Sequence, residues 1–468
     1  MRMRVQHTTH NTHLQCRVSV FIDDTADHIN ITQQLRQFLR LLSSTARNWW
    51  TTNKLRREIQ GAWPSTRAHA TTQVQPKDDL MSDGAKSNGG RAHPPPPSAG
   101  MTLENQGTWD SSTQTFHGGQ DWAHLSNFVE DFSVTTNGLG TPEAAVQAAY
   151  KAVSHIKHYP PSDFEPAASD LARFLWPGES WTHGRQRLLL GNGASELIDL
   201  VIRSATPGKW RPGPQRTQYK EYARSALAAG FTTAPTTDRS ATLLCMVNPT
   251  NPTGDYWGID KMKAFIEGSC EAGTTVIVDE SMQPWIGPKW REDSLYSQAE
   301  WIKDMSDEKG VNVWVMTSWT KIWSCCGVRL GSVVAPTPEL QKAVKAKQVP
   351  WSVNSIALHF LSEAVRDTDY LRRTWDLTRV WNRDMRAEIL KQHPDWEVHG
   401  KDFLSWLWID THDEEVARDV VRRTRAAGVP VRSGAPGYNL PTYFRAAVRS
   451  EELRASLLKA LSPLAPPA

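Results

Sequence analysis

Val313-Trp314-Val315-Met316-Thr317-Ser318-Trp319-Thr320-Lys321 joins a short apolar run to a lysine. Most lysines lie on a protein surface, but this one follows a strand-like run and has Trp319 and Trp323 on either side. That is an odd setting for a solvated side chain. Desolvation and a nearby cation would depress the pKa of its amine and make it reactive. The stretch therefore predicts a reactive lysine at the end of a buried strand.

Two motifs upstream and one downstream supply further polar groups. Asn251 lies in the doubled turn Asn248-Pro249-Thr250-Asn251-Pro252-Thr253-Gly254, and Asp279 ends the apolar run Val276-Ile277-Val278. A carboxylate after a buried strand is costly unless it is paired, and a helix N-cap is the alternative interpretation of Asp279. Arg329 follows Lys321 by eight residues.

An amine, an acid, an amide and a guanidinium are the groups that pyridoxal 5'-phosphate (PLP) needs from a protein. The amine bonds to the cofactor, the acid keeps the pyridine nitrogen protonated, the amide hydrogen-bonds the phenolic oxygen, and cations hold the phosphate. Lys321, Asp279, Asn251 and Arg329 match these needs in turn. The sequence therefore predicts a PLP-dependent enzyme.

The predicted phosphate site uses the beginning of a helix. Gly193, Ala194 and Ser195 follow a short apolar strand, and free backbone N–H groups with the helix dipole suit a phosphate there. The hydroxyls of Ser318 and Thr320 complete this anion site with Arg329. Tyr219 is the candidate for stacking on the pyridine ring, with an ordinary core aromatic as the alternative.

Short apolar runs alternate with helical patterns through the middle of the chain. We expect strands at 188–190, 243–247, 276–278 and 313–316, and helices at 142–156, 194–202 and 259–272. This order predicts an α/β fold with a large, mostly parallel sheet and the site at the carboxyl ends of its strands. Expected strands at 404–409 and 443–448 with a helix at 413–427 predict a smaller α+β domain. Prolines at 207, 212 and 214 predict that this segment cannot be a central strand.

Four segments follow from these patterns. Residues 1–105 are a disordered or targeting extension, 106–180 form the N-terminal part of the small domain and a dimer arm, 181–354 form the PLP-binding domain, and 355–468 form the C-terminal small domain. Gln73–Gly100, with Pro94–Pro97, cannot bury enough apolar surface to offset its ordering entropy. The basic stretch Met1–Ile22 leaves a mitochondrial targeting peptide open, but a dispensable tail, or upstream sequence wrongly joined to a gene that begins near Met101, is favoured.

Composition excludes several kinds of partner. The 53 basic and 50 acidic residues are well mixed, which is no footprint for nucleic acid, and no stretch approaches the ~20 apolar residues of a membrane helix. The five cysteines lack zinc-ligand spacing and indicate a reducing compartment, so we expect a cytoplasmic protein without a metal. The remaining partner class is a small-molecule amino acid or phosphorylated amine.

Asn251, Asp279, Lys321 and Arg329 together resemble the signature of fold-type I PLP enzymes, the class I/II aminotransferase superfamily. The similarity runs from about Phe116 to Leu464. Within the superfamily the chain is most similar to threonine-phosphate decarboxylases, with histidinol-phosphate aminotransferases as the neighbouring branch. The strings that carry this likeness are Phe116-His117-Gly118-Gly119, Asp131-Phe132-Ser133, Asn137–Gly140, Pro350–Asn354, Arg432-Ser433, Tyr443-Phe444-Arg445 and Val448-Arg449-Ser450.

The resemblance implies roles for residues that pattern alone does not assign. Arg445 would bind the substrate α-carboxylate, and Arg432 and His117 would bind the substrate's own phosphate. Tyr159 would reach the cofactor phosphate of the other subunit in a homodimer. The resemblance also implies the Schiff base at Lys321 and the cofactor contacts described above.

The chain also departs from the family. Met282 stands where aminotransferases usually have a tyrosine, and the link from Phe231 to Thr242 is too short for a helix found in the family. We expect decarboxylation of an O-phospho-L-threonine-type substrate. The alternatives are histidinol-phosphate-like transamination with a 2-oxo acid and an inactive PLP-fold binding protein. The unusual region 207–242, a true variant or a gene-model error, is the sequence support for the last.

Overall fold

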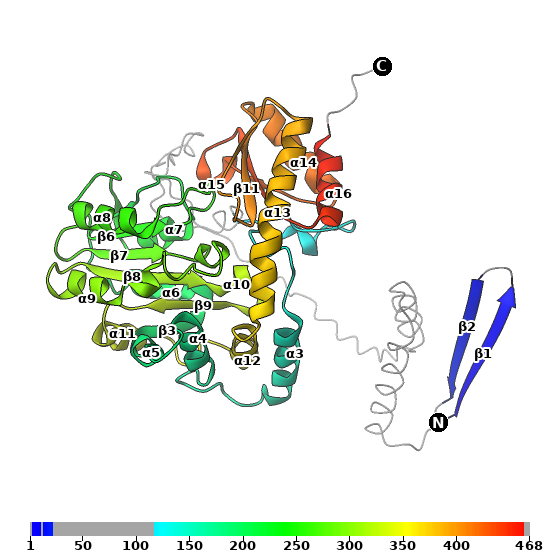
Figure 1. The fold of residues 1–468 in the computed structure, drawn as a ribbon, viewed down its shortest axis with the longest axis horizontal. Coiled ribbons are helices and arrows are strands. Elements are labelled where there is room, and N and C mark those ends of the chain that lie inside the picture. Colours follow the sequence, from blue (N-terminus) through cyan, green and yellow to red (C-terminus); the bar gives the residue numbers. More distant parts are fainter. Residues whose placement is uncertain (1, 11–12, 22–116, 463–468) are drawn as a thin grey trace, which may run out of the picture. The chain divides into compact units, whose positions relative to one another are not determined.

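The computed structural model describes residues 2–10, 13–21 and 117–462, and the chain divides into two units, Met1–Pro95 and Pro96–Ala468 (Figure 1). In the first unit β1 (Arg2–His10) pairs antiparallel with β2 (His13–Phe21). Valine and threonine in β1 and two valines in β2 favour strands. The prediction of a disordered or targeting extension did not include this hairpin, and the predicted linker Gln73–Gly100 lies outside the described residues.

A seven-stranded sheet forms the centre of the second unit. Its order is β3 (Leu188–Asn192), β9 (Leu330–Val334), β8 (Asn312–Ser318), β7 (Thr275–Asp279), β6 (Leu243–Val247), β4 (Lys209–Pro212) and β5 (Thr232–Thr233). The strands from β8 to β5 are parallel, while β9 runs antiparallel to both of its neighbours. The predicted α/β fold with a mostly parallel sheet is confirmed.

Helices cover both faces of this sheet because alternate strand residues point to opposite sides. Val276 and Val278 enter one apolar core together with α4 (Ala167–Leu175), α8 (Ile259–Ser269), α9 (Ala299–Asp307) and α12 (Ser355–Ala364). Ile277 enters the other core, with α6 (Gly193–Ile202) and α7 (Glu221–Ala228). Burial on both faces explains why these strands read as continuous apolar runs.

The C-terminal part forms the smaller α+β domain. Its four-stranded sheet has the order β10 (Glu397–His399), β11 (Trp406–Asp410), β13 (Tyr443–Ala447) and β12 (Arg432–Ser433), and every pair is antiparallel. α14 (Glu414–Ala426) and α16 (Glu451–Leu461) pack on it, and the 25-residue helix α13 (Thr368–Gln392) connects it with the large sheet (Figure 1). In the described part of the chain, no helix combines the length and the apolar character needed to cross a membrane.

One fold prediction is wrong. Lys209–Pro212 forms β4, an interior strand paired with Thr232–Thr233 on one side and Leu243–Cys245 on the other. The segment tolerates its prolines because Pro212 is the last strand residue, so Trp210 and Arg211 form the middle of the strand and the N–H of Gly213 resumes bonding to the carbonyl of Cys245. The link from Phe231 to Thr242, all of it described, contains only β5 and turns.

Candidate active site

A pocket opens where the carboxyl ends of the central strands meet the beginning of α6. Asp279 ends β7 and Ser318 ends β8, and these strands are neighbours, so the two polar residues lie at one edge of the sheet. The pocket is lined by Thr135, Ala194, Ser195, Tyr219, Val247, Asn251, Asp279, Ser281, Met282, Ser318, Thr320, Lys321 and Arg329. Residues from four separate sequence motifs are thus brought together as predicted.

Asp279 is buried and holds two hydrogen bonds. The backbone N–H of Ser281 donates to its Oδ1 at 2.9 Å, and the hydroxyl of Tyr222 donates to its Oδ2 at 2.9 Å. Burial raises the pKa of Asp279 above its ordinary value, and the two donors and the charge of Lys321 oppose that rise. The carboxylate forms no ion pair with any described residue. It is therefore oriented for a partner with a positive N–H.

Tyr222 is a site residue that the sequence motifs did not predict. It lies in α7 one turn after Tyr219, and burial beside Asp279 holds the pKa of its phenol well above the ordinary value. A second tyrosine three residues after Tyr219 is a signal that could have found it, and the two rings lie close together, with centroids 6.3 Å apart. Tyr219 itself lines the pocket, as the stacking role requires.

Lys321 lies in the short helix α10 (Trp319–Ile322), directly after β8. Trp319 and Trp323 are fully buried, with their rings stacked at a centroid distance of 5.2 Å, and the indole N–H of Trp319 donates to Ser332. The two tryptophans anchor the backbone that carries the lysine. The ammonium of Lys321 donates only to Cys326 Sγ, at 3.8 Å, among the described residues, so it is available to a ligand.

The predicted anion site is assembled around Gly193. This residue has φ +77°, and a Cβ there would lie 2.3 Å from Nη2 of Arg329, so the guanidinium packs directly against the first turn of α6. Ser318 and Thr320 share a hydrogen bond of 2.8 Å between their hydroxyls. A cation, two hydroxyls and a helix N-terminus converge, which is an arrangement that suits a phosphate.

Arg445 connects the small domain to this pocket. It is buried on β13, and its guanidinium donates to the amide oxygen of Asn251 and to the carbonyl of Ser133. Because Asn251 accepts from Arg445, its NH₂ group is left to donate to a ligand. Arg445 Nε has no partner among the described residues, and burial lowers the pKa of the guanidinium.

Arg432 and His117 lie beside the pocket without lining it. Arg432 is directly opposite Arg445 in the β12–β13 ladder, so both side chains lie on one face of the small sheet. His117 shares a 2.7 Å hydrogen bond with Glu221, and its ring centroid is 5.8 Å from that of Tyr219.

Tyr159 lies away from this pocket. Its side chain is 78% exposed and stacks on Trp351 with ring centroids 4.4 Å apart. Its predicted role in a neighbouring subunit stays a prediction.

A family model described as aminotransferase class I and II matches residues 129–461. The chain belongs to this family. The predicted superfamily of PLP-dependent enzymes is therefore confirmed. This class I/II family member is 27% identical over 368 residues to a threonine-phosphate decarboxylase of Salmonella typhimurium, covering 72% of the chain and 92% of the relative. It is 25% identical over 348 residues to histidinol-phosphate aminotransferase 1 of Cupriavidus pinatubonensis, covering 69% and 85%.

Solved structures agree on the fold of this family member. A histidinol-phosphate aminotransferase from Sinorhizobium meliloti, solved in complex with pyridoxal-5'-phosphate, matches with a TM-score of 0.61 and 18% identity over 78% of this chain and 97% of that one. An L-threonine-O-3-phosphate decarboxylase from Porphyromonas gingivalis matches with a TM-score of 0.57 and 16% identity over 71% and 98%. At such identities the likeness establishes the fold alone.

Proposed function

We propose that this protein is a PLP-dependent enzyme that decarboxylates a phosphorylated amino acid of the O-phospho-L-threonine type. The pairing of Arg445 with Arg432 is the observation that carries the proposal. Arg445 reaches Asn251 in the pocket, and Arg432 provides a second cation on the same face of the small sheet. Two neighbouring cations suit a substrate with two anionic groups, an α-carboxylate and a phosphate ester.

The pocket residues fit PLP. The buried acid Asp279 would hold the pyridine nitrogen, Asn251 the phenolic oxygen and Tyr219 the ring face. Lys321 would bond to the cofactor covalently. Gly193, Ala194, Ser195, Ser318, Thr320 and Arg329 would hold the phosphate, at a cradle that a Cβ on Gly193 would fill. When bound, PLP would supply an acceptor for the electrons of a bond broken at the substrate Cα.

The chain's own cations would decide which bond breaks. If Arg445 alone positions the α-carboxylate, the Cα–H bond would be the one broken, and Lys321 would take its proton. If Arg432 and His117 also hold the distal phosphate, the substrate would be positioned so that the Cα–carboxylate bond breaks instead. CO₂ would then leave, and Lys321 would donate a proton to Cα.

The test is incubation of the PLP-loaded protein with O-phospho-L-threonine, with and without 2-oxoglutarate. Release of CO₂ without any keto acid supports decarboxylation. Formation of glutamate from 2-oxoglutarate supports transamination, the activity named for most of the relatives. A protein that gains no visible cofactor absorption, and in which Lys321→Ala changes nothing, would be an inactive binding protein.

We further propose a homodimer in which Tyr159 completes the partner's site. The segment around it exposes large apolar side chains that a partner surface would cover: Tyr150, Val153, Ile156, Tyr159, Val349 and Trp351. Mixing Lys321→Ala with Tyr159→Ala protomers tests this arrangement. If Tyr159 acts across the dimer, each mixed dimer regains one intact site and activity returns. If the mixture stays inactive, Tyr159 does not act in this way.

A further inference from the structure

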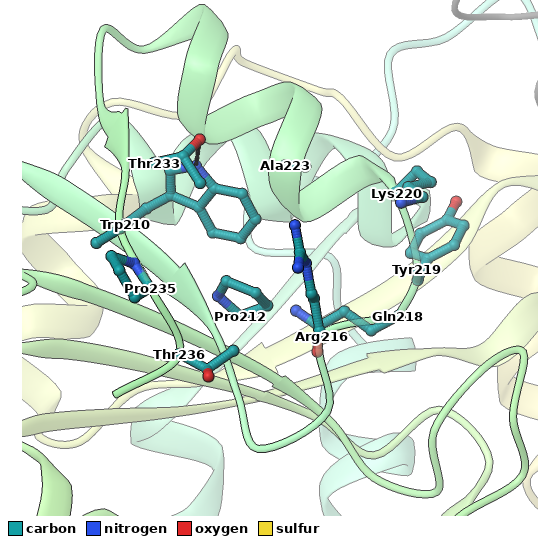
Figure 2. A pocket seen from close by; sticks show the side chains of 11 residues that line it. Trp210, Pro212, Arg216, Gln218, Tyr219, Lys220, Ala223, Thr233, Pro235 and Thr236 are labelled. Carbon is teal, nitrogen blue, oxygen red and sulfur yellow. Dashed lines mark hydrogen bonds between the residues drawn. The ribbon is translucent and has the colours of Figure 1, made fainter. Parts of the chain in front are cut away.

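A second pocket adjoins the candidate active site at Tyr219, which lines both. Trp210 and Pro212 form one side, Tyr219 and Lys220 form the other, and Arg216 extends between them (Figure 2). Its described lining contains two cations and no carboxylate. Its lining comes from β4, the β4–α7 connection, the beginning of α7 and the residues from Thr233 to Thr236.

Lys220 extends this row of cations toward the small domain. Its ammonium lies 5.2 Å from the ring centroid of Tyr438, and the Arg432 guanidinium lies 5.7 Å from the same centroid. Neither cation has a carboxylate within ion-pair distance in the described part of the chain, and the side chain of Arg432 donates to the backbone carbonyl of Pro436. Both cations therefore gather at one aromatic ring without an anion between them.

This arrangement is costly without a ligand. Arg432 is buried, and burial lowers its pKa to about 10. Burial also lowers the pKa of Lys220 to about 8, with the charges of Arg216 and Arg432 adding to the effect. A cation at an aromatic face is attracted by the ring, but the ring does not neutralise two charges. A bound anion would.

We infer that Lys220 is a specificity-determining residue that, together with Arg432, binds the distal anionic group of the substrate. The inference rests on the proposed function, in which Arg445 binds the α-carboxylate. Arg445, Arg432 and Lys220 then form a row from the cofactor pocket to the adjoining pocket. Lys220 thereby selects a phosphorylated amino substrate over its hydroxyl counterpart.

The experiment compares two amines on the full-length, PLP-loaded protein at pH 7, O-phospho-L-threonine and L-threonine. Binding is followed by the change in the cofactor absorption spectrum. Lys220→Met should weaken binding of O-phospho-L-threonine about tenfold or more, as expected for a lost charge-assisted contact, and change L-threonine binding less than about twofold. Lys220→Arg should restore most of the preference. Lys209→Met is the matched control. Lys209 lies on the nearby strand β4 and pairs with Asp238, and its loss should leave the binding of both amines as in the wild type.

The pH dependence separates this role from a packing role. The groups that face Lys220 are Arg216 and Tyr219 on its own connection, Arg432 on β12 and Tyr438 in α15 (Ala435–Tyr438). The preference for the phosphorylated amine should decline between pH 7 and about 9 as the Lys220 ammonium loses its proton. Lys220→Met should show no such decline.

The outcomes distinguish this inference from the proposed reaction. If Lys220→Met weakens the binding of both amines equally, or of neither, the inference is overturned even if CO₂ is released from O-phospho-L-threonine. The same comparison with L-histidinol phosphate and L-histidinol covers the transaminase alternative. Suppose that Lys220 is needed for a preference for L-histidinol phosphate over L-histidinol, and that no CO₂ is released from O-phospho-L-threonine. The inference about Lys220 then stands, and the proposed decarboxylation is rejected. If no phosphorylated amine binds more tightly than its counterpart, Lys220 has no such role.

Discussion

Two regions of the active site are built differently: the floor, formed by the strand ends at Asp279 and Ser318, and the mouth, formed by Lys220 and Arg432. At the floor, Asp279 and Ser318 end regular neighbouring strands. Tyr222 and the backbone N–H of Ser281 donate to Asp279, and the backbone N–H of Ser318 donates to the hydroxyl of Ser281. At the mouth, the irregular β4–α7 connection brings Lys220 to Arg432 with no carboxylate between them. Rigid elements orient groups that act in every turnover, while connections vary with the substrate. In the proposed function, the floor would therefore set the chemistry and the mouth would select the substrate.

Asp279→Asn should have the largest effect and tests the floor. Loss of the carboxylate should weaken PLP binding by on the order of 100-fold, because it removes one partner of a buried charged pair. In the cofactor-free protein the effect on stability should be the opposite. The pKa of Asp279 is raised in the fold, so its stability contribution falls as the pH rises above 3.8, and the asparagine should raise the cofactor-free Tm at pH 7.

Cofactor titration and thermal unfolding with and without PLP measure both effects. A lower Tm in the cofactor-free Asp279→Asn protein would mean that the carboxylate stabilises the fold itself and is not held there at a cost for a ligand.

Gly193→Ala tests the cradle at the beginning of α6. The new Cβ would lie 2.3 Å from the Arg329 guanidinium and must displace it, so PLP affinity should fall about 10- to 100-fold through lost charge-assisted bonds. Gly178→Ala is a matched control, because Gly178 has a similar φ of +91° and a Cβ there would meet nothing within 4 Å. Both variants should lose about 1 kcal/mol of stability through backbone strain, and only the first should lose PLP. Equal PLP affinities would show that the cradle does not bind the phosphate.

Tyr222→Phe removes a donor from Asp279 and should cost about 1.5 kcal/mol of folding free energy at pH 7. The loss should shrink in an Asp279→Asn background, because the tyrosine then no longer serves a carboxylate. Urea unfolding of the four proteins in this double-mutant cycle measures the coupling. Additive losses would indicate that Tyr222 contributes by packing alone.

Lys220→Met should have the smallest effect and tests the mouth. The pKa of Lys220 falls from 10.5 to about 8 on folding, so between these values the unfolded chain binds more protons and stability rises with pH. Below pH 8 the full cost of the charge is present. The methionine should therefore stabilise the ligand-free protein by about 1 kcal/mol at pH 7, after allowance for partial exposure, and by nothing above pH 10.5. Unchanged or lower stability at pH 7 would mean that the buried charge of Lys220 does not destabilise the ligand-free protein.

Much of the fold follows from the sequence because the central strands are buried on both faces. Leu243–Val247 is predicted and observed with the same bounds, and Val276–Val278 and Val313–Met316 lie within β7 and β8. β4 was missed, since a proline-bearing segment forms a strand only when its neighbours supply the pairing. The hairpin β1–β2 was missed as well.

The sequence by itself determined the family, the order of the strands that end at polar residues, and the groups Lys321, Asp279, Asn251 and Arg329. These features follow from local sequence patterns, namely apolar runs typical of buried strands and the spacing of the polar residues after them. Only the tertiary structure decided that Tyr222 serves Asp279, that Arg445 reaches Asn251, and that Lys220 meets Arg432 at Tyr438. The last two join residues about 200 positions apart. Such contacts depend on how two separate sheets pack, which no local pattern encodes.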